Sequence, residues 1–425
     1  MSNILRKSIV FSILSVATVA QGAEFELHPS LAVSEEFTDN VFETNIRRNS
    51  DYITRVLPGL AMRYNAPALT GDLSYVFDYR HYARGIRDDE IAHTLNAKGH
   101  LTAVENFLYL DVSDDYQRVS LDPTRDVTGE SLFVNQIDRN VVTVAPYFTI
   151  RPTERIPIKA GYRFIDTRYF GLSDTSGYQL TGSRYADSFG VDKVDHVAFL
   201  NIAYEFSKRF SLTADYTFTR EFGRIENFSQ HQALGGFRYE YADKSFLFAQ
   251  AGNNWISYDY SGRSLNSIVW NAGITHVFNT VTATVTTGVR YNEDPLSSIL
   301  KESFVSGIIE KQLNRGTISF SPTYSEYVRT ETDTLETKKY GAVLRGQYEL
   351  SADLKGNLAF TAEKYERPLQ GSYTRRIQVE SGLGYLLAKD LTASLTYIYT
   401  GYYSPEIVSD NWHVNRAMIE IKKTF

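Results

Sequence analysis

The stretch from residue 70 to residue 80 alternates between two kinds of side chain. The odd-numbered positions carry glycine, leucine and aromatic residues, namely Gly71, Leu73, Tyr75, Phe77 and Tyr79. The even-numbered positions, which have the opposite parity, are mostly polar and include Thr70, Asp72, Ser74, Asp78 and Arg80. Successive side chains of a β-strand point to opposite faces, so this pattern predicts a strand with one apolar and one polar face. The pattern recurs throughout a chain of 425 residues, without a helical period between the copies. A closed β-barrel in a membrane is the architecture that suits such a sheet best.

We expect an all-β fold, a transmembrane antiparallel β-barrel of about twenty strands, between 18 and 22. The alternating segments lie at residues 25–37, 51–64, 68–84, 91–104, 107–120, 138–150, 154–170, 193–207, 210–224, 230–242, 245–260, 266–278, 281–293, 301–313, 316–330, 337–350, 354–367, 373–387, 391–403 and 410–425. Under this division, short turns alternate without exception with longer polar links, among them 38–50, 121–137, 171–192 and 292–300. Outer-membrane barrels have short periplasmic turns and long extracellular loops, so an even strand number predicts both termini in the periplasm.

The first 23 residues predict a secretory signal peptide. Arg6 and Lys7 precede an apolar run over 9–20 that is too short to span a bilayer, and small residues follow. From residue 24 onward the chain has no run of 18 apolar residues, so no transmembrane helix is expected. The sequence therefore predicts Sec-dependent export and a barrel domain over residues 24–425 in a bacterial outer membrane.

The composition agrees with a barrel. The chain contains 30 tyrosine and 25 phenylalanine residues, yet its mean hydropathy is -0.29. Only alternate residues of a barrel meet lipid, and aromatic residues collect at both membrane interfaces. A soluble β-sandwich or propeller is the alternative, but the chain lacks the repeat or strand spacing of those folds. A net charge of -6 argues against nucleic acid as a partner, and the absence of cysteine excludes thiolate metal sites and covalently attached haem.

If the apolar parity faces lipid, the opposite parity lines the lumen. Thirteen charged residues of this parity are expected there: Asp72, Asp78, Arg80, Lys159, Arg163, Asp215, Arg290, Arg345, Glu349, Lys355, Glu363, Arg376 and Glu380. A charge on the lipid side costs about 2–4 kcal/mol near the midplane, which favours this segregation. Two interpretations stay open: the charges select the solute in a water-filled path, or they pair across strands and stiffen the wall.

A barrel of about twenty strands is too wide for side chains to fill, so its lumen holds water, a folded-in loop or a partner. The longest links, 121–137 and 171–192, are the candidates for a constriction. The second link contains Tyr178, Arg184, Tyr185 and Asp187, a set that suits contact with sugar rings but equally suits packing within the loop. The carboxylates at 88–90 and 114–115 are either solvated or bind divalent cations that bridge lipopolysaccharide.

The eight histidines show no catalytic or metal-binding constellation. His93 and His100 are seven residues apart, which gives them opposite parity on a strand and prevents a shared site. His231 near Glu226 is the arrangement closest to an acid–base pair. We therefore expect no enzymatic activity, no cofactor and no metal.

The N-terminal part carries the most specific motifs. The run Leu-His-Pro-Ser-Leu-Ala-Val-Ser-Glu-Glu-Phe-Thr-Asp-Asn-Val-Phe at 27–42 is followed by Ser-Asp-Tyr-Ile-Thr at 50–54, Pro-Gly-Leu at 58–60, His-Thr-Leu-Asn-Ala at 93–97 and Phe-Leu-Tyr-Leu-Asp at 107–111. In these motifs, which cover about the first 120 residues, the chain resembles outer-membrane β-barrel proteins associated with PEP-CTERM/exosortase systems, which tend to sit in exopolysaccharide loci. The resemblance implies an outer-membrane location and a role in export or surface assembly of exopolysaccharide. It implies no catalytic or binding residues.

Together these features predict an outer-membrane β-barrel pore for polysaccharide or another polar polymer. The expected partners are outer-membrane lipid and lipopolysaccharide, the barrel-assembly machinery, and a periplasmic polysaccharide-export protein. The last strand ends in Phe425, with Ile419 and Ile421 on the same parity, and so resembles the assembly signal, although Lys423 stands where a hydrophobic residue is usual. One rival hypothesis is a general diffusion porin, and another is a barrel sheath around a periplasmic multihaem cytochrome.

Overall fold

The computed structural model of the chain describes residues 22–46, 48–120, 136–170, 191–224, 226–293, 299–330, 332–406, 408 and 411–425. Its elements are β1 (Glu24–Thr38), β2 (Asp51–Asn65), β3 (Leu69–Tyr82), β4 (Glu90–Val104), β5 (Leu108–Ser120), β6 (Gln136–Thr153), β7 (Ile156–Phe170), β8 (Lys193–Ser207), β9 (Phe210–Gly223), β10 (Asn227–Ala242), β11 (Ser245–Tyr258), β12 (Ser264–Phe278), β13 (Val281–Glu293), β14 (Ile299–Leu313), β15 (Gly316–Arg329), β16 (Thr334–Glu349), β17 (Leu354–Arg367), the 3-10 helix η2 (Pro368–Gln370), β18 (Ser372–Ala388), β19 (Leu391–Tyr403) and β20 (Trp412–Thr424). The predicted count of twenty strands is confirmed, and every predicted boundary falls within three residues of the observed one.

The strands form one closed antiparallel sheet. Each strand pairs with its neighbours in the chain, and the barrel closes where β1 pairs with β20. At this seam Val33 is opposite Ile421, and the N–H of Phe425 donates to the carbonyl oxygen of Pro29 just beyond the last paired residues. The prediction of a closed antiparallel β-barrel is therefore confirmed.

The connections differ between the two ends of the barrel. At one end, which we call the short-turn end, all nine connections contain two to four residues. Positive φ angles at Asn106, Lys244 and Asn279 suit tight hairpin turns, because such turns follow the right-handed twist of the flanking strands. At the other end, the loop end, the connections range from three residues (224–226) to 22 residues (171–192).

The expected strict alternation of short and long connections is wrong in detail. At the loop end, the connections 224–226, 330–333 and 368–371 are no longer than the turn 350–353 at the short-turn end. A hairpin needs only two connecting residues, so strand pairing does not impose a long loop at either end. Because the number of strands is even, the start of β1 and the end of β20 both lie at the short-turn end.

The two faces of the sheet differ in chemistry and in exposure. Along β1, Leu27, Leu31 and Val33 are 41–46% exposed, whereas Ala32 and Ser34, on the opposite parity, are buried. The strand register places residues of the same kind opposite each other on neighbouring strands. Exposed aliphatic and aromatic residues therefore form an apolar band around the outside of the barrel. This outer face is the one that suits lipid.

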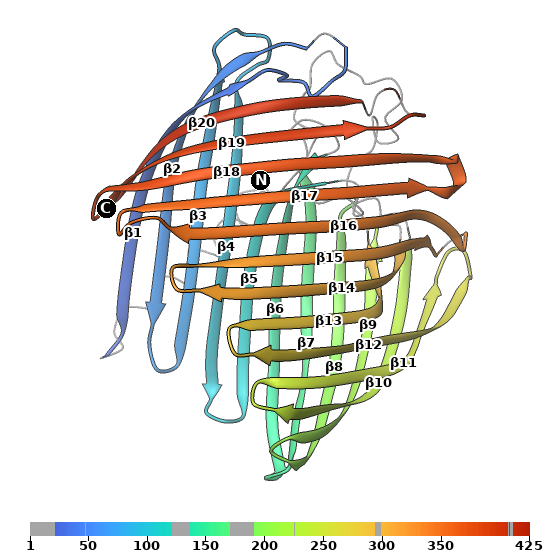
Figure 1. Cartoon of the computed structure of the whole chain (residues 1–425). Helices are drawn as coiled ribbons and strands as arrows, with labels where there is room; N and C mark the ends of the chain where they lie inside the picture. Colours follow the sequence, from blue (N-terminus) through green and yellow to red (C-terminus); the bar gives the residue numbers. More distant parts are fainter. Residues whose placement is uncertain are drawn as a thin grey trace, which may run out of the picture.

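The interior of the barrel is wide. Figure 1 shows the strands β13–β20 of the near wall crossing those of the far wall at a steep angle, as the tilted strands of a barrel do. Twenty strands about 4.8 Å apart and tilted by about 40° close into a ring roughly 40 Å across. Side chains from such a wall do not reach the axis, so the wall alone does not fill the interior.

Several predictions concern residues outside those that the structure describes. They include positions 1–21 of the expected signal peptide and most of the links 121–137 and 171–192. The candidate constriction residues Tyr178, Arg184, Tyr185 and Asp187 belong to the second link and also lie outside. Within the described ranges, no helix is long and apolar enough to cross a membrane.

Candidate functional site

The thirteen charged residues predicted to face the lumen share one face of the sheet, opposite the apolar band. The register links them across neighbouring strands, with Glu349 opposite Lys355 and Glu363 opposite Arg376. Directly opposed residues of an antiparallel pair point to the same face. Their common face agrees with the sequence pattern, while the hypothesis that they border a path for solute stays a prediction.

This inner face is open toward one end and buried toward the other. Near the short-turn end, the side chains of Asp72 on β3 and Lys355 on β17 are 67% and 69% exposed. Asp78 and Glu363 lie on the same two strands nearer the loop end, and their side chains are only 10% and 6% exposed. Water therefore reaches the inner wall at the short-turn end and is largely excluded from these positions near the loop end.

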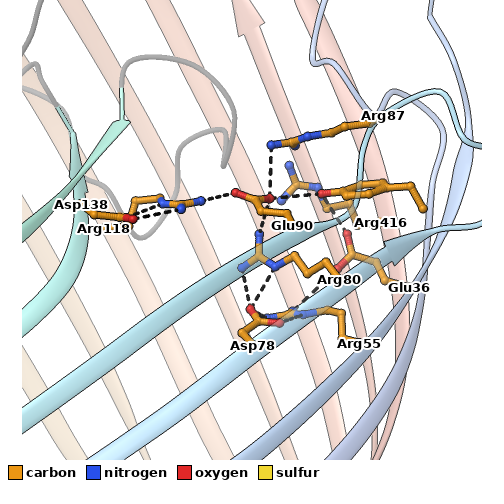
Figure 2. Close-up of polar contacts among 10 residues, drawn as sticks. Glu36, Arg55, Asp78, Arg80, Arg87, Glu90, Arg118, Asp138 and Arg416 are labelled. Carbon is orange, nitrogen blue, oxygen red and sulfur yellow. Dashed lines mark hydrogen bonds and ion pairs between the residues drawn. The ribbon is translucent and has the colours of Figure 1, made fainter. Parts of the chain in front are cut away.

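A network of ion pairs occupies the buried part of the wall near the loop end (Figure 2). We call it the charged layer, and it comprises Glu36, Arg55, Asp78, Arg80, Arg87, Glu90, Arg118, Asp138 and Arg416. Asp78 accepts from two guanidinium groups, with Arg55 Nη2 and Arg80 Nη2 each 2.6 Å from its Oδ2. Both arginines also donate to this carboxylate through Nε. Such charge-assisted, forked contacts hold all three side chains in place.

Glu90 joins the two halves of the charged layer. Its Oε2 lies 3.2 Å from Arg87 Nη2 and 3.6 Å from Arg80 Nη1, and its Oε1 accepts from Arg118. Arg118 Nε in turn donates to Asp138 at 2.8 Å, so the contacts continue to β6. Arg87 lies in the loop just before β4. Burial lowers the pKa of its guanidinium, but an arginine stays protonated in proteins.

The charged layer also crosses the seam of the barrel. Arg416 of β20 lies 3.8 Å from Glu36 of β1 and donates to Glu43 in the first loop. Glu36 lies 4.0 Å from Arg55 of β2. With Glu43 included, five arginines face five carboxylates, so these residues carry no net charge. They connect the first six strands of the barrel to the last one.

A second cluster of paired charges lies on β16–β18, and it contains two of the predicted residues. Glu363 accepts from Arg376 Nη1 at 2.6 Å and from the Tyr365 hydroxyl at 2.8 Å. Lys339 Nζ lies 3.1 Å from the other carboxylate oxygen. Only 2% of the Arg376 side chain is exposed, so this cluster, like the charged layer, is shielded from water.

A third cluster lies on β13–β15 and contains the predicted residue Arg290. Its Nε donates to Glu302 at 2.6 Å, and Ser325 and Tyr327 donate to the same carboxylate at 2.8 and 3.1 Å. Only 2% of the Glu302 side chain is exposed. Paired charges near the loop end are thus present in several sectors of the barrel.

The other predicted residues make more local contacts. Asp215 accepts from Asn201 Nδ2 at 2.6 Å and from Gln250 Nε2 at 2.7 Å. Lys159 Nζ lies 3.8 Å from the centre of the Tyr147 ring. Lys159, Asn201 and Asp215 belong to the lining of a hollow of about 640 Å³ in the inner wall, near the short-turn end.

Like Lys159 and Asp215, the last three predicted residues form no ion pair with another described residue. Arg163 lies over the ring of Phe199, 5.6 Å from its centre. The register aligns Arg345 and Glu380 on either side of Ala359, without a salt bridge between them. The inner wall therefore carries both paired and unpaired charges.

Sequence reasoning found Asp78 and Arg80 but missed the rest of the charged layer. The missed residues are Glu36, Arg55, Arg87, Glu90, Arg118, Asp138 and Arg416. Glu36, Arg55 and Arg416 have the inner parity near the loop end of their strands. Counting parity on the first two strands and the last one would have included them.

The other candidate constellations are not assembled in the structure. His231 forms a 2.7 Å hydrogen bond with the hydroxyl of Tyr216 on the outer face, while Glu226 accepts from a backbone N–H in the loop after β11. His93 and His100 lie on opposite faces of β4, as expected. Among the described residues, no group of three or more histidines and carboxylates is arranged to hold a metal ion.

Comparison with known proteins establishes the fold. No family model and no curated protein matches the chain. It is similar to a mutant of the ferric enterobactin receptor PfeA of Pseudomonas aeruginosa, with a TM-score of 0.54 and 10% identity over 94% of this chain and 80% of the receptor. The FrpB iron transporter of Neisseria meningitidis gives a TM-score of 0.54 and 8% identity over 94% of this chain and 82% of FrpB. For OpdK of Pseudomonas aeruginosa the TM-score is 0.43 and the sequence identity is 10%, over 94% of this chain and 98% of OpdK. The similarity to PfeA and FrpB shows that the chain has the architecture of an outer-membrane β-barrel.

Proposed function

We propose that the protein is an outer-membrane pore for the export or surface assembly of exopolysaccharide, with the short-turn end as its periplasmic entrance. The change in exposure along the inner face is the observation that supports this proposal. The wall is wetted near the short turns and buried in paired charges near the loop end. A polymer entering from the periplasm would meet a wide vestibule first and a constriction later.

The charges of the inner wall suit a neutral or weakly charged polymer. Each charged group of the charged layer lies within 4.0 Å of an opposite charge. Paired charges produce a small net field, unlike the rings of one sign that select ions. Guanidinium and carboxylate groups also hydrogen-bond well to hydroxyl groups, which a polysaccharide presents at every residue.

The first test asks whether the charged layer helps to narrow the path at the loop end. The purified wild-type barrel should conduct little in a planar bilayer, and the double variant Arg80→Gln/Glu90→Gln should conduct more. The matched control is Arg63→Gln/Asp72→Asn, which removes a 3.1 Å pair whose side chains are both 67% exposed at the open end. This control should leave conductance unchanged. Steady, large conductance of the wild type would favour a general diffusion porin instead.

The second test concerns the cargo. Deletion of the gene should strip polysaccharide from the cell surface and leave the uptake of small solutes intact. Loss of solute uptake with normal surface polymer would contradict export and favour a diffusion porin. Co-purification of a multihaem cytochrome with the barrel would favour the sheath hypothesis.

A further inference from the structure

Three cations lie on neighbouring strands of the outer face, close to the loop end. Lys338 is on β16, Lys364 on β17 and Arg375 on β18, in the near wall of Figure 1. We call these three residues the outer basic patch. They share the parity of exposed Ile377, which belongs to the apolar band, and therefore point away from the lumen. The patch lies on β16–β18, strands to which the charged layer does not extend.

Two of these cations have a carboxylate partner. Lys338 Nζ lies 3.2 Å from Glu326, and Lys364 contacts Glu366. In the part of the chain that the structure describes, no carboxylate forms an ion pair with Arg375, and its side chain is exposed. Arg375 is thus available to an external anion.

Lys364 and Arg375 are placed directly opposite each other in the β17–β18 pair. Side chains in this position lie close together, and like charges there are destabilising. Both cations also lie over the same ring, with Lys364 Nζ 5.0 Å and Arg375 Cζ 5.2 Å from the centre of Tyr373. An anion bound between them would convert this repulsion into two attractive contacts.

The depth of the patch matches a membrane interface. On β18 the exposed outer residues include Tyr385, Leu383 and Ile377, and Arg375 follows two residues beyond Ile377. The ten residue-to-residue steps from Tyr385 to Arg375, on a strand tilted by about 40°, advance about 26 Å along the barrel axis. The apolar band of a transmembrane barrel is about 25 Å tall. With Tyr385 at one interface, Arg375 therefore lies at head-group level on the other side.

We propose that the outer basic patch binds the phosphate group of a phosphorylated glycolipid in the outer leaflet. The planar guanidinium of Arg375 can hold two phosphate oxygens, and Lys364 supplies a second charge opposite it. Ile377, one outward-facing position deeper in the membrane, would contact the acyl chains, which distinguishes a lipid from a free phosphate ion. This inference does not depend on what the barrel transports.

The test uses the full-length barrel in a zwitterionic detergent, with diphosphorylated lipid A as the probe and native mass spectrometry as the readout. Lys364→Gln/Arg375→Gln should bind the lipid at least about tenfold more weakly, as expected for the loss of a charge-assisted hydrogen bond. The matched control is Lys311→Gln, which removes an outward-facing lysine at the short-turn end of β14 and should not change binding. Lys364→Arg keeps the charge and should bind like the wild type.

Two further arms separate the sources of phosphate. The affinity of the wild type for dephosphorylated lipid A should be no higher than the affinity of the double variant for diphosphorylated lipid A. Inorganic phosphate at the concentration of the lipid should not displace it. Equal binding of diphosphorylated lipid A by wild type and double variant would overturn the proposal. Full displacement by inorganic phosphate would overturn the assignment to a lipid.

Discussion

The cluster around Glu363 offers a quantitative test of how the inner wall is stabilised. Its carboxylate is 6% exposed and holds two cations, Arg376 at 2.6 Å and Lys339 at 3.1 Å. In Glu363→Gln the amide oxygen can still accept a hydrogen bond, but it neutralises neither cation. The substitution therefore leaves two buried positive charges without their counter-charge.

Removing one partner of a buried ion pair costs about 3–5 kcal/mol, because the remaining charge stays out of water. We expect Glu363→Gln to lower the free energy of unfolding by about 3 kcal/mol, since the amide keeps part of the hydrogen bonding. The control, Glu349→Gln, breaks a 3.0 Å pair with Lys355 whose side chains are 53% and 69% exposed. An exposed pair contributes about 0–1 kcal/mol, so the control should be nearly neutral.

The assay is urea unfolding of the barrel in lipid vesicles, followed by the fluorescence of its three tryptophans. Both variants replace a glutamate of the neighbouring strands β16 and β17 by glutamine, so their difference mainly reports the effect of burial. A difference below about 1 kcal/mol would refute the reasoning, because the two pairs would then be equivalent despite their different exposure. Replacing Lys339, Glu363 and Arg376 together by methionine should cost less than Glu363→Gln alone, because it leaves none of these charges unpaired.

Two further predictions concern packing and pH. Gly161→Ala should destabilise the barrel by about 1–3 kcal/mol in the same urea assay, because its Cβ would lie 2.5 Å from Cβ of Tyr147, whereas Gly384→Ala meets open space and should be neutral or slightly stabilising. A hydrogen bond from Lys423 lowers the pKa of Asp390, in the turn after β18, below its ordinary value of 3.8. This pair therefore stabilises the fold above that pH and loses its effect as the pH falls through the lowered pKa; an NMR titration of Lys423→Gln should find the Asp390 pKa higher than in the wild type.

The fold was predictable because few strand arrangements are possible in a barrel of this kind. Its strands pair in chain order, so once twenty alternating segments are recognised, the topology follows without long-range information. Parity also assigns the faces, as Leu73 and Asp72 on β3 illustrate. Connection lengths were less predictable, because polar residues at strand ends suit a continued strand and a loop equally well.

The site was predictable only in part, for a geometric reason. The alternation of side chains places Asp72 and Asp78 on the same face of β3. Because this alternation is the same along the whole strand, it does not show how far a residue lies from either end of the barrel. The contrast between 67% and 10% exposure at these positions depends on what surrounds the wall at each level. Likewise, Arg80 reaches Glu90 only because the register sets the two residues opposite each other on β3 and β4. Partners of this kind become visible when the strands are aligned in space.

Consecutive residues of β17 show how one strand separates two roles. Glu363 faces inward and neutralises buried cations, whereas Lys364 faces outward beside Arg375. Replacing Lys364 by glutamine removes a repulsion between opposed like charges, worth roughly 0.2–1 kcal/mol, although it also gives up the exposed contact with Glu366. Its net effect on stability should therefore be small, while its effect on lipid binding should be large. A residue whose loss weakens binding without weakening the fold has a binding role, and the same comparison at Glu363 should show the opposite.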